Sequence, residues 1–138
     1  MATKMQSLFP RWGEGADYLY LVGCSDGSIK VGRTKDPTSR IRCHRSRLRE
    51  KFAWAHLFCH KTGGAEMRAM GQLSIAGGHR PTKRGETFLG LSKATALSAC
   101  RIAIAAHAEE MEKHRLYLLR ERIAEKAWTA FKAGLVVA

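Results

Sequence analysis

The chain has 138 residues, 45% of them hydrophobic and 26% charged, so it can bury the core of one domain and is not a disordered tail. Lys and Arg number 24 against 12 Asp and Glu, and a polyanion is the partner that best relieves the resulting net charge of +12. No apolar run of about 18 residues occurs, which excludes a membrane-spanning segment, and no membrane partner is expected. The start of the sequence lacks the apolar core of a signal peptide, so a cytoplasmic location is expected. The four cysteines show no CxxC spacing and are expected to be reduced thiols.

The first regular element expected is a β-hairpin over residues 18–32. Residues 1–16 show little periodicity and are expected to form a lead-in segment. The tract 18–22 (Tyr-Leu-Tyr-Leu-Val) is apolar, aromatic and β-branched, as strands prefer. Asp26-Gly27 is a favoured pair for a tight turn, and the apolar pattern resumes at Ile29.

A helix, a strand and a second helix are expected to follow the hairpin. Asp36-Pro37 predicts a helix over 37–49, because Asp caps free amides and Pro suits the first turn. This helix is expected to turn Ile41, Cys43, His44 and Leu48 toward one side. Large and small residues alternate over 52–59, a period of two that indicates a strand. Thr62 is expected to cap a helix that runs to about Ile75 and ends at Gly77-Gly78.

The remaining sequence is expected to form a basic loop and a short extended piece over 79–91, and then helix almost to Gly134. No Pro or Gly interrupts residues 92–133, so about 40 residues can be continuous helix, far beyond the usual globular length of about 11–12. Such a helix either pairs with a second copy, giving a homodimer, or lies solvated. The elements together predict an α+β fold, a small central antiparallel sheet flanked by helices with a C-terminal helical extension over 92–138.

Five short motifs in order resemble the GIY-YIG nuclease superfamily over residues 17–91. Tyr18-Leu19-Tyr20 stands where the family has Gly-Ile-Tyr, and Lys30-Val31-Gly32 stands where it has Tyr-Ile-Gly. The tract 32–40 (Gly-Arg-Thr-x-Asp-Pro-x-x-Arg) is similar to a DNA-binding branch, found in phages and mobile elements, with a Lys-Ile-Gly form of the second motif. Ala65-Glu66 and Gly85-Glu86-Thr87-Phe88 match two later motifs of that branch.

The resemblance implies a set of catalytic roles. Arg40 would grip phosphate oxygens with its planar fork, at the start of a helix where backbone amides also attract phosphate. His44 lies one helical turn further on and would carry a proton or bind phosphate. Tyr20 would lie against the attacking water, and Lys30 would replace the missing tyrosine as a phosphate contact. The departures at Tyr18 and Lys30 leave open which residue is the general base.

Glu66 is the candidate metal ligand. One carboxylate with waters and a phosphate oxygen suits Mg²⁺ (or Mn²⁺), which keeps most of its hydration shell. A glutamate in the first turn of a helix is also favoured by the helix dipole alone, and Glu86 is a rival ligand. The pairs Cys43-His44 and Cys59-His60 offer four potential zinc ligands. Structural zinc sites use ligands two to four residues apart, so these adjacent pairs are not expected to bind zinc.

The basic residues supply the expected nucleic-acid contacts. Phosphate contacts position a protein on its nucleic acid without reading sequence, so intrinsic sequence preference is expected to be low. The candidates are Arg33, Lys35, Arg42, Arg45, Arg47, Arg49, Arg80, Lys83 and Arg84.

The leading hypothesis is a metal-dependent DNA endonuclease, a hydrolase of phosphodiester bonds. One alternative is a catalytically inactive DNA-binding module on the same fold, favoured by Lys30 in place of tyrosine. Another is a dimeric regulatory or anti-nuclease protein that acts through its long helix. Single-stranded DNA, double-stranded DNA and RNA all remain open as substrates.

Overall fold

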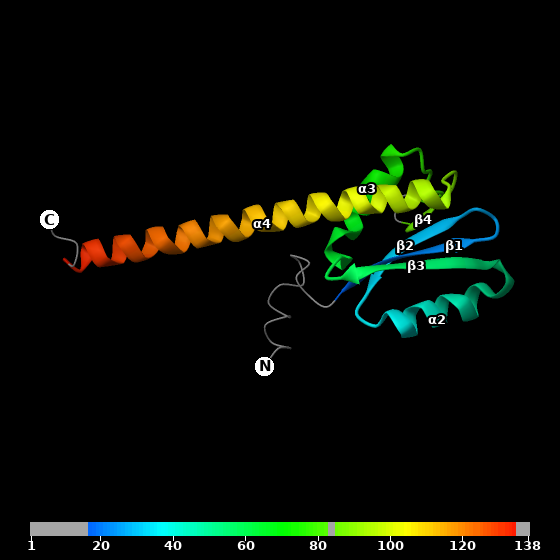
Figure 1. Ribbon diagram of the computed structural model, residues 1–138, viewed down its shortest axis with the longest axis horizontal. Coiled ribbons are helices and arrows are strands. Elements are labelled where there is room, and N and C mark those ends of the chain that lie inside the picture. Colours follow the sequence, from blue (N-terminus) through cyan, green and yellow to red (C-terminus); the bar gives the residue numbers. More distant parts are fainter. Residues whose placement is uncertain (1–16, 83–84, 135–138) are drawn as a thin grey trace. The chain divides into compact units, whose positions relative to one another are not determined.

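The computed structural model describes residues 17–82 and 85–134 (Figure 1). The expected lead-in segment, 1–16, and the candidates Lys83 and Arg84 lie outside the described residues. The elements in chain order are β1 (Tyr18–Cys24), β2 (Ile29–Thr34), α2 (Pro37–Leu48), η2 (Arg49–Lys51), β3 (Phe52–His60), η3 (Gly63–Ala65), α3 (Glu66–Ile75), β4 (Thr87–Phe88) and α4 (Lys93–Lys132).

The strands form one antiparallel sheet in the order β3-β1-β2-β4. Helix α2 lies on one side of the sheet, and α3 with the start of α4 lies on the other (Figure 1). The expected α+β class is confirmed in this form: a four-stranded antiparallel sheet flanked by helices, and a long C-terminal helix. The four cysteines, all of them within the described residues, form no disulfide.

The hairpin of β1 and β2 forms as the turn residues predict. Cys24 N–H donates to the Ser28 carbonyl (2.8 Å), and Gly27 adopts φ 89°, which a side chain would strain. The Asp26 carboxylate accepts from the Ser28 amide (2.9 Å) and hydroxyl (2.6 Å), which closes the turn. The period of two predicted for β3 is also confirmed. Its odd-numbered residues from Ala53 to Leu57 are exposed, and the residues between them are half-buried.

Helix α2 begins as expected but packs differently. The Asp36 carboxylate accepts from the Ser39 amide at 3.1 Å, and Pro37 occupies the first turn. His44 is the one buried residue of this helix, and Cys43 is exposed, so the expected inward side is wrong for Cys43. Cys43 precedes His44 by one residue, about 100° around a helix, and so points away from the sheet.

Thr62 has a different task from the expected one. It stands before η3, but its side chain caps no helix. The register between β1 and β3 shifts between Tyr18 and Tyr20, which leaves Leu19 without a β3 partner. The Thr62 hydroxyl accepts from the Leu19 amide (3.0 Å) and donates to the Cys59 carbonyl (2.6 Å). The expected helix cap is therefore wrong, because the Thr62 hydroxyl is already hydrogen-bonded to buried backbone groups at this irregularity.

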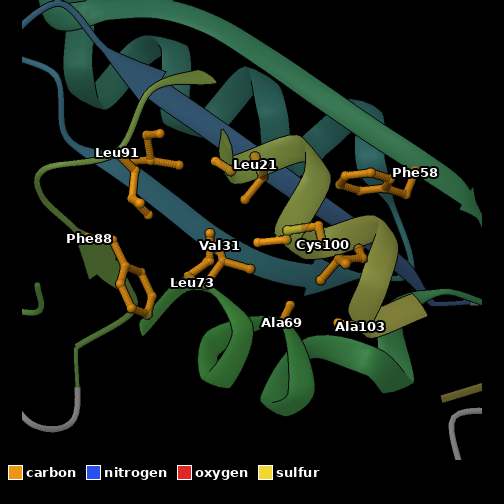
Figure 2. Packing of buried hydrophobic residues seen from close by; sticks show 13 residues of the cluster. Leu21, Val31, Phe58, Ala69, Leu73, Phe88, Leu91, Cys100 and Ala103 are labelled. Atoms are coloured by element: carbon orange, nitrogen blue, oxygen red, sulfur yellow. The ribbon is translucent and has the colours of Figure 1, made fainter. Parts of the chain in front are cut away.

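The hydrophobic core lies between the sheet and the two helices α3 and α4 (Figure 2). Leu19, Leu21 and Val31 come from the sheet and are fully buried. They meet Leu73 of α3, whose helix ends as expected where Gly77 adopts φ 104°. The buried residues of α4 in this core are small, namely Ala96, Ala99, Cys100 and Ala103, and the larger Leu97 and Ile104 pack against the core while only partly buried.

Helix α4 is continuous over 40 residues, which confirms the uninterrupted helix expected from residue 92. Ser92 stands directly before its first residue, Lys93, and the Ser92 hydroxyl accepts from the Thr95 amide at 3.1 Å. The chain divides into two compact units, Met1–His107 and Ala108–Ala138, and the helix runs through both. None of the described helices combines the length and the apolarity that crossing a membrane requires.

The role of Thr62 is tested by Thr62→Val, which keeps the shape and removes the hydroxyl. We expect the free energy of unfolding to fall by about 1–3 kcal/mol, because the Leu19 amide is left buried without an acceptor. Thr62→Ser keeps the hydroxyl and should recover most of this loss in urea denaturation. Equal stability of Thr62→Val and the parent protein would contradict the assignment.

Candidate functional site

Tyr20 and His44 form a buried hydrogen-bonded pair between the sheet and α2. The Tyr20 hydroxyl lies 2.9 Å from His44 Nε2, and the two residues are 3% and 4% exposed. Side chains alternate along β1, so Leu19 and Leu21 enter the core while Tyr20 faces α2. The structure therefore brings together the tyrosine and histidine that were selected in sequence as separate candidates.

Gly32 provides the room for this pair. It is the strand partner of Tyr20 on β2, and a Cβ at Gly32 would lie 2.5 Å from the tyrosine hydroxyl oxygen. Real Cβ atoms do not approach other atoms so closely. The glycine of the second motif is therefore needed here for close approach and not for an unusual backbone angle.

The surroundings of the pair keep both members neutral at pH 7. Burial, followed by the charges of Lys30, Arg40 and Arg47, lowers the pKa of His44 below its ordinary value. Burial raises the pKa of Tyr20, with Glu86 and Glu66 adding to this while Arg40 and Arg47 oppose it. A neutral imidazole beside a neutral phenol can accept the phenolic proton when the phenol takes one from another molecule.

Three cations surround the pair from two elements. Arg40 and Arg47 come from α2, Lys30 comes from β2, and the charges of all three act on His44. Both arginines are exposed, and no carboxylate within residues 17–82 and 85–134 forms an ion pair with them. These guanidinium groups are thus available to an anion from solvent.

Glu66 is close enough to the pair for its charge to affect the tyrosine. As the first residue of α3, it is half-buried. Burial is the main cause that raises the pKa of Glu66, and the negative charge of Glu86 is the next. Arg33 acts in the opposite direction through its charge and a backbone hydrogen bond. Glu86 lies beside β2 because its carbonyl accepts from the Val31 amide at 3.0 Å.

Asp17 is a buried acid that belongs to none of the motifs. Its Oδ2 lies 3.8 Å from Arg33 Nε, and its Oδ1 is buried without a hydrogen-bond partner among the described residues. Its charge also raises the pKa of Glu66. Sequence reasoning missed Asp17, and the signal available was its position as the acid directly before the first strand.

The acidic side of the site fits a hydrated divalent cation better than a fully protein-ligated one. No three His, Cys, Asp or Glu side chains converge into a metal-binding group anywhere in the described parts of the chain. Mg²⁺ does not need such a group, because it binds through one or two carboxylates and retains its waters. Glu66, whose ionised form is disfavoured by burial and by Glu86, would gain most from a cation placed beside it.

The other nucleic-acid candidates divide into two groups. Arg80 is half-buried, donates to the Gly85 carbonyl (3.5 Å) and lies 5.7 Å from the centre of the Phe88 ring. It therefore holds its own loop. The others lie at the surface on β2, on α2 or between and after them: Arg33, Lys35, Arg42, Arg45, Arg47 and Arg49.

A groove runs along α2 where the helix meets β3. Apolar side chains of Ile41 and Leu57 line it together with the guanidinium-bearing Arg42 and Arg45. Arg45 also lies 5.1 Å from the centre of the Phe52 ring, a cation–π contact that supports its position. Helix α2 thus presents arginines both beside the groove and beside the Tyr20–His44 pair.

Comparison of the chain with protein-family models, with curated proteins and with solved structures finds no match.

The close approach at Gly32 is tested by Gly32→Ala. We expect the free energy of unfolding to fall by about 1–3 kcal/mol, because the added methyl displaces the tyrosine hydroxyl from His44. Gly71→Ala is the matched control, since Gly71 lies in α3 with open space around it. That change should stabilise the protein by up to about 1 kcal/mol. Urea denaturation measures the change in the free energy of unfolding for both variants. Equal changes in Gly32→Ala and Gly71→Ala would contradict the close approach at Gly32.

The buried neutral state of His44 predicts a pH dependence of stability. The unfolded chain binds a proton near the ordinary histidine pKa, about 6.5, whereas folded His44 does so only at lower pH. Stability should therefore fall as pH decreases below about 6.5. His44→Gln keeps a partner for Tyr20 but does not titrate, so its loss should be smaller.

Thermal unfolding of the parent and of His44→Gln between pH 8 and pH 5 measures this difference. His56, whose pKa is also lowered by burial, accounts for part of the remaining slope. Parallel curves for the parent and His44→Gln would show that His44 is not held neutral.

Proposed function

We propose that this chain is a metal-dependent DNA endonuclease of the GIY-YIG type. The observation that carries the proposal is the 2.9 Å hydrogen bond between Tyr20 and His44, set among Lys30, Arg40 and Arg47 with Glu66 nearby. Hydrolysis of a phosphodiester requires an activated water, a group that neutralises charge at phosphorus and a stabilised leaving oxygen. The residues of this site can meet the first two requirements.

Proton transfer in the proposed reaction uses the buried pair. The Tyr20 oxygen takes a proton from the attacking water and passes its own proton to neutral His44. The water oxygen forms a bond to phosphorus as the bond to the leaving oxygen breaks, and the leaving oxygen is protonated from solvent. This order agrees with the raised pKa of Tyr20, which makes a free phenolate unfavourable, and with the lowered pKa of His44.

Charge at the phosphate is neutralised from two sides in this proposal. The guanidinium of Arg40 binds two non-bridging oxygens, and Lys30 and Arg47 add positive charge. Glu66, with Glu86 beside it, would hold Mg²⁺ or Mn²⁺, which when bound withdraws charge from the phosphate. Burial of Glu66 keeps this carboxylate in one place, so that a hydrated ion is positioned and not only attracted.

The substrate is expected to be recognised through its backbone. The exposed arginines of α2 offer phosphate contacts, and no described element resembles a zinc finger or a helix-turn-helix. Affinity should therefore fall steeply with salt. The proposal commits to DNA, and RNA is the competing substrate in the experiment below.

A binding module without catalysis is the second candidate, and Lys30 is the observation that favours it. Outside the branch with the Lys-Ile-Gly motif, the superfamily has a tyrosine at this position, and Lys30 lacks the phenol that this tyrosine offers to the attacking water. A module of this kind would keep the arginines of α2 and bind DNA without cutting it.

Cleavage of labelled single-stranded DNA, double-stranded DNA and RNA with Mg²⁺ or Mn²⁺ tests the proposal. EDTA should abolish cutting, and Arg40→Ala should lower the rate by about 100-fold or more through lost transition-state charge stabilisation. Glu66→Gln should lower the rate comparably and raise the metal concentration needed. Arg68→Ala is the matched control, because it removes an exposed arginine of α3, on the other side of the sheet from α2, and this variant should cut normally.

The same samples separate the two candidate functions. DNA binding without cutting by the parent, unchanged in Glu66→Gln, would replace the nuclease proposal with the binding module. Cutting that persists in EDTA, or in both site variants, would point to a contaminating enzyme and count against the site.

A further inference from the structure

The second unit of the chain exposes a large apolar face. Beyond Ala108 it consists of the C-terminal part of α4, and its large apolar side chains are between 38% and 61% exposed. At about 100° per residue, most of them lie on one half of the helix circumference. This apolar face consists of Leu116, Tyr117, Leu119, Ile123, Ala124, Ala127, Trp128, Ala130 and Phe131, and it contains one charged residue, Arg120.

The apolar face has the composition of an interface. Three of its residues are aromatic, the class of side chain enriched in the centres of protein interfaces. Trp128 and Phe131 already stack on each other, with ring centres 5.8 Å apart and an interplanar angle of 16°. Exposed apolar patches of this extent on proteins mark sites of association. Within residues 17–82 and 85–134 no other element covers this face, which leaves it open to a second molecule.

The charge of residues 108–138 is too small for this face to bind a polyanion or an anionic membrane. Residues 108–138 contain six basic and five acidic residues, so only +1 of the net charge of +12 lies there. A helix that binds anionic lipid or nucleic acid carries clustered Lys and Arg on its polar side. Here Glu121 and Glu125 stand among Arg122 and Lys126, a mixed polar side that fits a protein partner.

We infer that the apolar face binds the same face of a second copy of this chain, with the two helices antiparallel. The start of the segment carries Glu109, Glu110 and Glu112, and although Lys113 and Arg115 pair with two of these acids, three acids against two bases leave residues 109–115 with a net charge of −1. The end of the segment carries Lys126 and Lys132, with no acid after Glu125. An antiparallel pair places the acidic start of each helix beside the basic end of the other. The helix dipoles are also favourably opposed in that arrangement and not in a parallel one.

The charge of the first unit supports the same orientation. Met1–His107 carries the remaining +11 of the net charge and directly precedes the helix segment in the chain. A parallel pair would attach two such units to the same end of the paired helices, and an antiparallel pair attaches them to opposite ends. Repulsion between like charges falls with distance, so the antiparallel pair is favoured. This inference does not depend on the nuclease proposal.

Adjacent leucines provide a matched test of the face. Leu119 belongs to it, whereas Leu118 points to the opposite side of the helix, and the two are 43% and 45% exposed. The full-length parent should sediment as a dimer at tens of micromolar. Leu119→Glu should raise the dimer dissociation constant by about 100-fold or more, and Leu118→Glu should leave it within about threefold.

Two results of the sedimentation test would overturn the inference. A parent that stays monomeric at 100 micromolar has no self-association, and its apolar face then binds a different protein. Equal weakening by Leu118→Glu and Leu119→Glu shows that the interface is elsewhere. Circular dichroism of both variants identifies any loss of helix, and Ile123→Glu then repeats the test on the same face.

The orientation is tested by cysteine cross-linking in the full-length dimer. The face from Leu116 to Phe131 is centred near Ala124, so Ala124→Cys should form an intermolecular disulfide in an antiparallel pair. Ala130→Cys should not, because its two copies are about 20 Å apart along the axis at 1.5 Å per residue. The parent controls for its own exposed Cys43 and Cys59. Equal cross-linking at positions 124 and 130 would indicate parallel helices and overturn the proposed orientation.

Discussion

The hydrogen bond between Tyr20 and His44 is the contact on which the position of α2 depends. Four of the twelve residues in this helix are arginine, and His44 is the one that is buried. A helix so poor in apolar residues gains little from the hydrophobic effect, so a buried polar contact must fix its place over the sheet. The candidate chemistry and the attachment of the helix therefore use the same two side chains. A change in either residue alters both.

Local signals in the sequence predicted the hairpin and the start of α2, because Asp26-Gly27 and Asp36 act on backbone within a few residues. The role of Thr62 was not predictable in this way, since it follows from a shift of register between β1 and β3. The buried side of α4 was also hidden. Its core residues are small, such as Ala99, while the larger Ile102 is 55% exposed. Close packing of a helix on a sheet selects for small size, which a hydrophobicity pattern does not detect.

The candidate site shows the same division between local and long-range information. Motif spacing selected Tyr20, Lys30, Arg40, His44 and Glu66, and in the fold the charges of Lys30, Arg40 and Glu66 act on the Tyr20–His44 pair. A strand period and a helical turn fix which neighbouring residues share a side, so spacing carries information of this local kind. Asp17 was missed because its relation to Glu66 and Arg33 arises from chain segments that are distant in sequence. Its buried, unpaired oxygen is visible only in three dimensions.

The position of β3 at the edge of the sheet has a consequence for how molecules of this protein behave together. Its nine residues contain no Lys, Arg, Asp, Glu or Pro, the residues that usually prevent an edge strand from pairing with the edge strand of another molecule. Positive charges lie around the strand instead: Arg42 and Arg45 line the groove with Leu57, and Lys93 lies 4.9 Å from the centre of the Trp54 ring. Mutual repulsion of these cations opposes pairing of the unprotected edges of two molecules. High salt screens that repulsion, so concentrated salt solutions favour precipitation through β3.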